Sequence, residues 1–296
     1  MTESERLSAA LLEALPYINY FAGKTVVVKL GGSTLGSEDT TLQDIALLKN
    51  LNIQPVLVHG GGSAITEWLG RIGKKAQFVR GLRVTDEETM DVVRMTLVGK
   101  VNTTLVSSLN ALGVHAVGIN GLDVRTIEAR QLSPDLGLVG EVTKVNLDLI
   151  NTLVKAGYIV VIAPVGSGEG EQALNLNADT AAGEIAAALQ AEKLISLTDV
   201  PGIKGKDGTL ISHCDRAMAE DLIQSGVISG GMIPKVQACL RALDGVRRAH
   251  IIDGRVSHAL VRELFTNGGV GTMITRSAEN GLAQSASIDA LVKSMQ

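Results

Sequence analysis

The stretch Thr25-Val-Val-Val-Lys-Leu-Gly-Gly-Ser-Thr-Leu-Gly-Ser37 decides how the rest of the chain is interpreted. Three consecutive valines favour a strand that is buried on both faces. Gly31 and Gly32 let the backbone turn sharply and bring N–H groups close to an anion. Lys29 stands where this strand meets the turn, and ligands of doubly wound α/β sheets bind outside the carboxyl ends of the strands. The stretch therefore suggests a phosphate site, although a lone Gly-Gly after a strand is more often an ordinary tight turn.

The same pattern, a strand followed by glycines, recurs further along the chain. It appears at Pro55-Val-Leu-Val-His-Gly-Gly-Gly-Ser63, and glycines precede a lysine again at Gly230-Gly-Met-Ile-Pro-Lys235. We predict a helix over 63–72, and the free N–H groups at its start could bind carboxylate or phosphate oxygens. His59 is expected to be a packed residue at the end of its strand. The repetition favours anion binding over a chance turn.

The composition excludes several classes of protein. The chain has 296 residues, of which 45% are hydrophobic and only 2% aromatic, so its core must be aliphatic. The 33 glycines suggest many tight turns between strands and helices. A formal net charge of −4 and the lack of a long lysine or arginine run argue against nucleic acid as the main partner.

The cysteines and the first residues of the chain indicate where in the cell the protein is expected. Cys214 and Cys239 have no partners at the spacing of a metal site or a disulfide framework, so we predict no protein-held metal and a reducing, cytoplasmic location. The start of the chain lacks the basic and apolar segments of a signal peptide. No apolar run approaches the roughly 18 residues that span a bilayer, so we expect no membrane partner.

The hydrophobic periodicity predicts alternating strands and helices. An amphipathic helix over 4–21, with a kink or break at Pro16, precedes the first strand and either folds back on its own lobe or packs against another subunit. We predict a long helix over 86–112 and a β-hairpin meander over 120–145. A second series of strands and helices starts near 190, with a helix over 233–248 and closing edge strands at 251–252 and 268–274. Since no linker lies near 190, we expect one continuous sheet.

Two amides and a carboxylate lie close together in the segment 173–186. Asn175 and Asn177 precede Asp179, which is expected in the first turn of a helix. Asp179 is therefore a candidate partner for Lys29. A simple helix cap without chemistry is the alternative.

The segment Val79-Arg-Gly-Leu-Arg-Val-Thr85 carries two arginines. The planar guanidinium of Arg80 or Arg83 could bind a carboxylate through two hydrogen bonds. A solvated surface arginine is the default interpretation for each of them.

Six segments follow one another in a fixed order. They are Val28-Lys-Leu-Gly-Gly-Ser33, Val58-His-Gly-Gly-Gly62, Gly81-Leu-Arg-Val-Thr85, Asn175-Leu-Asn-Ala-Asp179, Leu197-Thr-Asp-Val-Pro-Gly-Ile203 and Gly230-Gly-Met-Ile-Pro-Lys235. In this order they resemble the amino acid kinase family, and within it the branch that phosphorylates N-acetylglutamate. The resemblance covers the chain from about 24 to 274.

The resemblance implies an α/β fold, a three-layer αβα sandwich with a mostly parallel central sheet. It also implies three functional parts. A helix over 1–23 would serve oligomerisation and regulation, an N-terminal lobe over 24–190 would bind acetylglutamate, and a C-terminal lobe over 191–296 would bind ATP and an effector.

Individual roles follow from the same resemblance. Lys29 and Lys235 would stabilise the transferred phosphoryl group, and Asp179 would hold both lysines. The acetylglutamate site would include Gly61, Gly62, Arg83 at the α-carboxylate and Asn175 at the acetamido end. ATP, accompanied by Mg²⁺, would be bound by Gly31, Gly32, Asp199, Val200, Pro201, Gly202, Ile203, Lys204, Val227, Ile228 and Ser229.

The implied reaction is ATP-dependent phosphorylation of the γ-carboxylate of N-acetyl-L-glutamate to N-acetyl-L-glutamyl 5-phosphate, the second step of arginine biosynthesis. Phosphoryl transfer depends mainly on positioning and charge neutralisation, and the substrate carboxylate is itself the nucleophile. Related kinases act on other carboxylates, such as those of glutamate or acetylaminoadipate. A catalytically silent arginine or nitrogen sensor is the rival from another class, but the presence of Lys29, Asp179 and Lys235 favours catalysis.

The helix before the first strand and the segment from 250 to 273 resemble the arginine-sensitive branch of these kinases. The resemblance implies a homohexamer, a trimer of dimers joined by interlaced N-terminal helices. Arginine would be an inhibitor bound near His250, Glu263 and Gly269. A plain dimer with a folded-back helix is the alternative.

Overall fold

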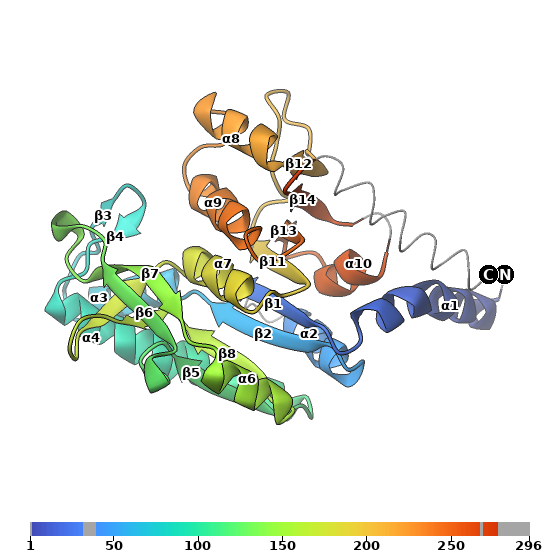
Figure 1. Cartoon of the computed structure of the whole chain (residues 1–296), viewed down its shortest axis with the longest axis horizontal. Helices are drawn as coiled ribbons and strands as arrows, with labels where there is room; N and C mark the ends of the chain where they lie inside the picture. Colours follow the sequence, from blue (N-terminus) through green and yellow to red (C-terminus); the bar gives the residue numbers. More distant parts are fainter. Residues whose placement is uncertain (1, 32–39, 267–268, 278–296) are drawn as a thin grey trace.

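A mixed sheet of eight strands forms the centre of the protein (Figure 1). The computed structural model describes residues 2–31, 40–266 and 269–277. The strands lie side by side in the order β12 (His213–Asp215), β14 (Gly271–Thr275), β13 (Arg248–Asp253), β11 (Lys193–Thr198), β1 (Thr25–Leu30), β2 (Gln54–His59), β8 (Ile159–Ala163) and β5 (Ala116–Asn120). All neighbours are parallel except β13 and β14. This confirms the mostly parallel sheet.

Strand β1 lies at the middle of the sheet, between β2 and β11. Lys29 is in register with Val58 on one side and with Ser196 on the other. Because β2 belongs to the first half of the chain and β11 to the second, the sheet runs continuously through both halves, as the missing linker predicted. The assignment of separate binding roles to the two halves stays a prediction.

Helices cover both faces of the sheet, because successive side chains of a strand point to opposite faces. Val26, Val28 and Leu30 pack in one core with α1 (Glu3–Phe21), α2 (Thr41–Asn50), α5 (Thr103–Ala111) and α10 (Ala259–Phe265). Val27 packs in the other with α6 (Asp148–Lys155), α7 (Ala178–Ala188), α8 (Arg216–Gln224) and α9 (Met232–Ala242). This is the predicted αβα sandwich. The alternation puts Lys29 on the face covered by α7.

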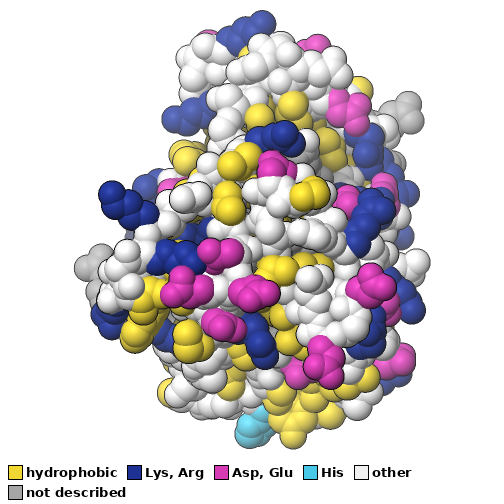
Figure 2. Space-filling model, turned by 90° about the vertical axis from the view of Figure 1, so that its left-hand side faces the viewer, with side chains coloured by type: hydrophobic (Ala, Val, Ile, Leu, Met, Phe, Trp, Pro, Cys, Tyr) yellow, Lys and Arg dark blue, Asp and Glu magenta, His cyan; other side chains and the backbone are white. Residues whose placement is uncertain are grey.

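A small barrel stands beside the sheet, formed by β6 (Ile127–Gln131), β7 (Val139–Val145), β9 (Val165–Ser167) and β10 (Ala173–Leu176). Strands β6 and β7 are antiparallel, which confirms the meander expected over 120–145. At the same end of the molecule lie α3 (Gly62–Arg71), α4 (Glu87–Arg94) and the hairpin of β3 (Phe78–Val79) and β4 (Leu82–Arg83) (Figure 1). Figure 2 views the molecule from this end. Basic and acidic side chains of the described residues are interspersed there and form no continuous basic surface.

Two predicted helices differ from the structure. The helix expected over 86–112 is interrupted by a π-helical segment, η1 (Met95–Asn102), between α4 and α5. The helix expected over 233–248 ends at Ala242. The chain then turns at Gly245, where a Cβ atom would lie 2.0 Å from the carbonyl oxygen of Ala187, so a side chain has no room there.

The strands expected to close the sheet are not at its edge. β13 and β14 are both interior, and the short β12, which the pattern did not reveal, covers the outer side of β14. A three-residue strand gives too little alternation to be recognised. Residue 268, part of the predicted strand, lies outside the described residues.

Helix α1 runs through Pro16 without a break, so of the two predicted alternatives the break is wrong and the kink stays a prediction. Tyr17 and Phe21 are buried in the core, whereas Leu7, Leu11 and Leu12 are 64%, 60% and 70% exposed. The first half of α1 therefore extends away from its own lobe (Figure 1). No helix of the described residues is both long and apolar enough to cross a membrane.

Candidate active site

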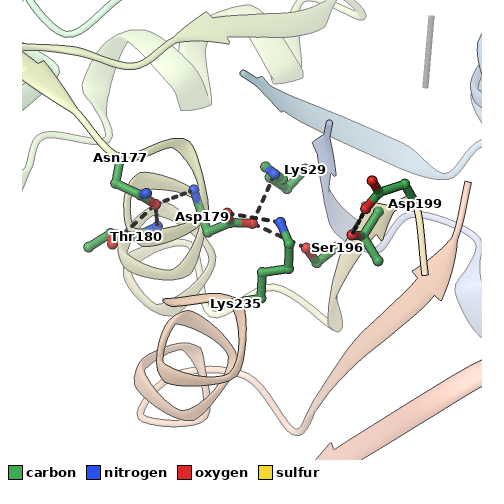
Figure 3. Close-up of polar contacts among 8 residues, drawn as sticks. Lys29, Asn177, Asp179, Thr180, Ser196, Asp199 and Lys235 are labelled. Carbon is green, nitrogen blue, oxygen red and sulfur yellow. Dashed lines mark hydrogen bonds and ion pairs between the residues drawn. The ribbon is translucent and has the colours of Figure 1, made fainter. Parts of the chain in front are cut away.

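Three side chains from three elements meet at the carboxyl end of β1. Asp179 of α7 contacts Lys29 of β1, with 2.9 Å between Oδ1 and Nζ, and Lys235 of α9, with 3.3 Å between Oδ2 and Nζ (Figure 3). One carboxylate therefore holds two ammonium groups. This confirms that the glycine-flanked lysines and Asp179, although far apart in sequence, lie together.

Local sequence fixes the position of Asp179. Asn177 caps α7, since its Oδ1 accepts hydrogen bonds from the backbone N–H groups of Asp179 and Thr180. Helix α9 approaches α7 closely at Gly183, where a Cβ atom would lie 2.6 Å from the carbonyl oxygen of Ala238. Glycine at that point lets α9 bring Lys235 to the carboxylate.

Burial and charge shape this cluster. The side chains of Lys29, Asp179 and Lys235 are only 6%, 10% and 18% exposed. Burial lowers the pKa of Lys29, and Asp179 partly opposes that shift. Burial alone would raise the pKa of Asp179, but the two lysines outweigh it and hold that pKa below its usual value. The carboxylate is thus ionised, and two ammoniums share one negative charge, which leaves a positive centre suited to an anion.

A cavity of about 200 Å³ opens beside this centre. Asp179 forms part of its wall, together with Gly60, Gly61, Gly62, Arg83 and Asn175. All four residues predicted to bind the acetylated amino acid therefore line one cavity. None of the described residues predicted to bind ATP lines it.

Arg83 is 8% exposed and keeps one nitrogen without a partner among the described residues. Its Nη2 donates to the carbonyl oxygen of Gly62 and to Oγ1 of Thr66, each at 2.8 Å, whereas the buried Nη1 makes no hydrogen bond. The ring of Phe78 lies 4.8 Å from the guanidinium carbon. An oriented guanidinium with unused donors fits a carboxylate.

Asn175 is linked to Arg83 through Thr85. Its Nδ2 donates to Oγ1 of Thr85 at 3.1 Å, and that hydroxyl donates to the carbonyl oxygen of Arg83 at 2.8 Å. Thr85 is completely buried. This chain of contacts links β10 to strand β4, which carries the arginine.

The glycine triplet packs against neighbouring side chains. A Cβ atom on Gly61 would lie 2.4 Å from Cδ2 of Leu97 in η1, so a side chain there would require Leu97 to move. His59 is buried, as predicted, with its Nδ1 2.9 Å from the carbonyl oxygen of Gly60 and its Nε2 3.2 Å from Nδ2 of Asn102. Burial lowers the pKa of His59 to about 4, so the ring is neutral at pH 7 and serves packing.

The residues predicted for ATP are distributed over other strand and helix ends. Gly31 follows β1, and Gly32 lies outside the described residues. The segment from Asp199 to Lys204 follows β11; within it Asp199, Pro201 and Lys204 are exposed, Gly202 and Ile203 are buried, and Val200 is half-buried. Val227, Ile228 and Ser229 lie between α8 and α9, and Ile228 shares a core with Ile203.

A second polar cluster lies near the root of α1. His250 Nδ1 and Glu263 Oε1 are 2.6 Å apart, and the N–H of Val270 donates to Oε2 of Glu263 at 2.9 Å. Gly269 has a φ of +52°, and a Cβ atom there would lie 3.1 Å from that same oxygen. The three residues predicted for an effector are thus neighbours.

Two basic residues of this cluster escaped the sequence analysis. Lys193 and Arg248 begin the adjacent strands β11 and β13 in register, and both are buried. Burial lowers the pKa of Lys193 to about 8, against the opposing effect of Glu263. Nε and Nη2 of Arg248 and Nε2 of His250 are buried without a partner among the described residues. The sequence did contain a signal for these two residues: each is a charged residue at the start of an otherwise apolar strand.

The chain is similar to proteins of known family. The model of the amino acid kinase family matches residues 24–253. Two proteins named acetylglutamate kinase are similar over 90% of this chain: one from Nostoc sp., 54% identical over 93% of its own length, and one from Gloeobacter violaceus, 53% identical over 92% of its length.

Solved structures share the fold. N-acetylglutamate synthase from Neisseria gonorrhoeae, complexed with coenzyme A and L-arginine, matches 92% of this chain with a TM-score of 0.80 and 30% identity, and this chain spans 66% of its length. An isopentenyl phosphate kinase, 22% identical with a TM-score of 0.59, shares the fold alone. From the matched family model and these relatives, the chain belongs to the amino acid kinase family.

Proposed function

We propose that this protein uses ATP to phosphorylate the γ-carboxylate of N-acetyl-L-glutamate, giving N-acetyl-L-glutamyl 5-phosphate in arginine biosynthesis. The observation that carries the proposal is the pair of lysines on Asp179 beside a cavity that Arg83, with one nitrogen lacking a partner among the described residues, also lines. Relatives named acetylglutamate kinase, about half identical over nine tenths of the chain, support the substrate.

The arrangement suits transfer to a carboxylate. The γ-carboxylate is already ionised and attacks phosphorus directly, so the protein needs no general base. Asp179 is occupied by Lys29 and Lys235 and cannot take that role. The two ammoniums instead neutralise charge on the transferred phosphoryl group, and the carboxylate keeps them at a fixed spacing.

The acetylated amino acid would occupy the cavity. Nη1 of Arg83 binds the α-carboxylate, Asn175 binds the acetamido group, and the N–H groups of Gly61 and Gly62 face the γ-carboxylate. The direction of the substrate then follows from the cavity itself, since Arg83 and Asp179 both form part of its wall. ATP would be bound by the residues after β1, after β11 and before α9.

We expect the metal ion to enter the site bound to the nucleotide and not to be held by protein side chains alone. Among the described residues no group of three or more His, Cys, Asp or Glu side chains could hold a metal ion. Mg²⁺ in kinases is bound largely by phosphate oxygens and water, where it neutralises phosphate charge.

The activity can be tested with the purified protein, ATP and Mg²⁺ by trapping the acyl phosphate with hydroxylamine. Acetylglutamate, glutamate, aspartate and acetylaminoadipate should be compared side by side, and acetylglutamate is expected to give the highest kcat/KM. A preference for another carboxylate would contradict the substrate. Failure with all four would favour the silent sensor.

Replacing Lys29 or Lys235 by alanine should lower kcat by about a hundredfold or more, because a preorganised charge is lost where negative charge shifts in the transition state. The KM for acetylglutamate should change much less. Steady-state kinetics of both variants provide the measurement. Variants with normal kcat and only a raised KM would show that the lysines serve ground-state binding.

Arg83→Lys should raise the KM for acetylglutamate by roughly tenfold or more, because a lysine cannot offer the guanidinium fork to a carboxylate. The KM for ATP should remain near that of the unchanged protein. Arg71→Lys, at an exposed arginine of α3 that pairs with Glu67, is the matched control and should change neither constant. Equal effects of Arg83→Lys on both substrates would assign Arg83 a structural role.

We also infer that arginine inhibits the protein through the cluster of His250, Glu263 and Gly269, in a hexamer joined by α1. The buried nitrogens of Arg248 and His250 that lack partners among the described residues support a ligand there, and Glu263 suits a cationic one. The exposed leucines of α1 support a contact with another copy of the chain. The synthase from Neisseria gonorrhoeae was solved with L-arginine.

Deleting residues 2–13 should give a smaller, active assembly that no longer responds to arginine. Inhibition requires that arginine bind one conformation of the hexamer more tightly than another, and without the α1 contacts the hexamer would not form. The truncation spares the buried Tyr17 and Phe21. Size-exclusion chromatography and an arginine titration of both proteins provide the measurement. The full-length variant Leu7→Glu with Leu11→Glu should behave in the same way. A full-length dimer that is insensitive to arginine would overturn this regulation and leave the kinase proposal intact.

A further inference from the structure

Asp179 has a third donor that the sequence did not reveal. The hydroxyl of Ser196 donates to Oδ1 of Asp179, with 3.3 Å between Oγ and Oδ1, and Ser196 is 3% exposed (Figure 3). The same oxygen lies 2.9 Å from Nζ of Lys29. Oδ1 is therefore shared by Lys29 and Ser196, while Oδ2 contacts Lys235.

The position of Ser196 follows from the sheet. Ser196 and Lys29 are register partners on the parallel strands β11 and β1, so their side chains leave the same face toward α7. Strand β11 is itself flanked by β1 and β13. The hydroxyl thus reaches the carboxylate from a backbone that is fixed on both sides.

The three donors differ in freedom. A lysine ammonium stands on a flexible four-carbon stem, whereas a serine hydroxyl is one bond away from its Cβ atom. During phosphoryl transfer both ammoniums must also serve the phosphate, which weakens their hold on the carboxylate. The serine contact is the one that the reaction leaves unchanged.

We propose that Ser196 is a positioning residue for phosphoryl transfer, which fixes the Asp179 carboxylate so that Lys29 and Lys235 keep one spacing as the phosphoryl group moves. The inference rests on the proposed kinase function. It assigns Ser196 no contact with either substrate, so its effect must pass through Asp179.

The test is the full-length variant Ser196→Ala, assayed with acetylglutamate, ATP and Mg²⁺. We expect kcat to fall roughly tenfold, the size of one lost hydrogen bond to a charged group. Both KM values should stay within about twofold, because neither substrate touches the serine. Ser196→Cys has a side chain of similar volume that donates only weakly, so its kcat should lie between those of Ser196→Ala and the unmodified protein.

Two comparisons separate positioning from a general structural effect. Ser167→Ala removes another buried serine hydroxyl, on β9 of the barrel, and should leave kcat unchanged. In an Asp179→Ala background, measured with enzyme in excess, Ser196→Ala should cause no further loss, since the oxygen that it positions is gone.

The outcomes are distinct. An unchanged kcat for Ser196→Ala, an equal loss in the Asp179→Ala background, or a change confined to KM would each overturn the inference while the kinase function stands. If Ser196→Ala does not fold, Ser196→Cys alone decides, and a normal kcat for it overturns the inference. An unmodified protein that makes no acyl phosphate would instead refute the proposed function.

Discussion

The carboxylate of Asp179 is the constraint on which the site depends, because it must compensate two buried ammonium groups at once. Removing one partner from a buried ion pair typically costs about 3–5 kcal/mol, since the remaining charge is left without compensation. Here the partners come from β1, α7 and α9, so the close approach of α7 and α9 at Gly183 and the cap at Asn177 both support one electrostatic centre.

The sheet explains why such a centre forms at this place. Lys29 lies near the end of a strand in which Val26, Val27, Val28 and Leu30 are completely buried, and β2 beside it ends at the glycine triplet. Parallel neighbours bring their carboxyl ends to one edge, where loops and helix starts present N–H groups. The positive centre by itself suits any anion, and we propose that the arginine of β4 adds selectivity for a carboxylate while the amide of β10 binds the acetamido group.

Much of this could be predicted because the signals are local. A valine run that ends in lysine and glycines, a glycine triplet before a helix and an asparagine before α7 each specify their own turn or cap. The missed features depend on contacts across the fold. Ser196 contacts Asp179 from β11, which lies beside β1, and Asn102, at the end of η1, contacts His59 of β2.

The wrong boundaries have the same origin. The apolar spacing of residues 243–248 continues a helical pattern, but the approach of Gly245 to Ala187 requires a turn. The buried pair of Lys193 and Arg248 contradicts the rule that strands in the middle of a sheet are apolar, and single-sequence patterns give no reason to expect them in register. Site residues that keep a local motif were therefore found, and those that complete the site from another strand were not.

The position of β1 between β2 and β11 also determines when each of its edges can be paired during synthesis. During synthesis β2 follows β1 after a short interval, but β11, the other neighbour of β1, emerges more than a hundred residues later. Until then one edge of a strongly apolar strand has no partner, and such edges are prone to pair with other chains. Lys29 is the only charged residue between Thr25 and Leu30, so the residue that we propose for phosphoryl transfer also interrupts an otherwise aggregation-prone segment of the nascent chain.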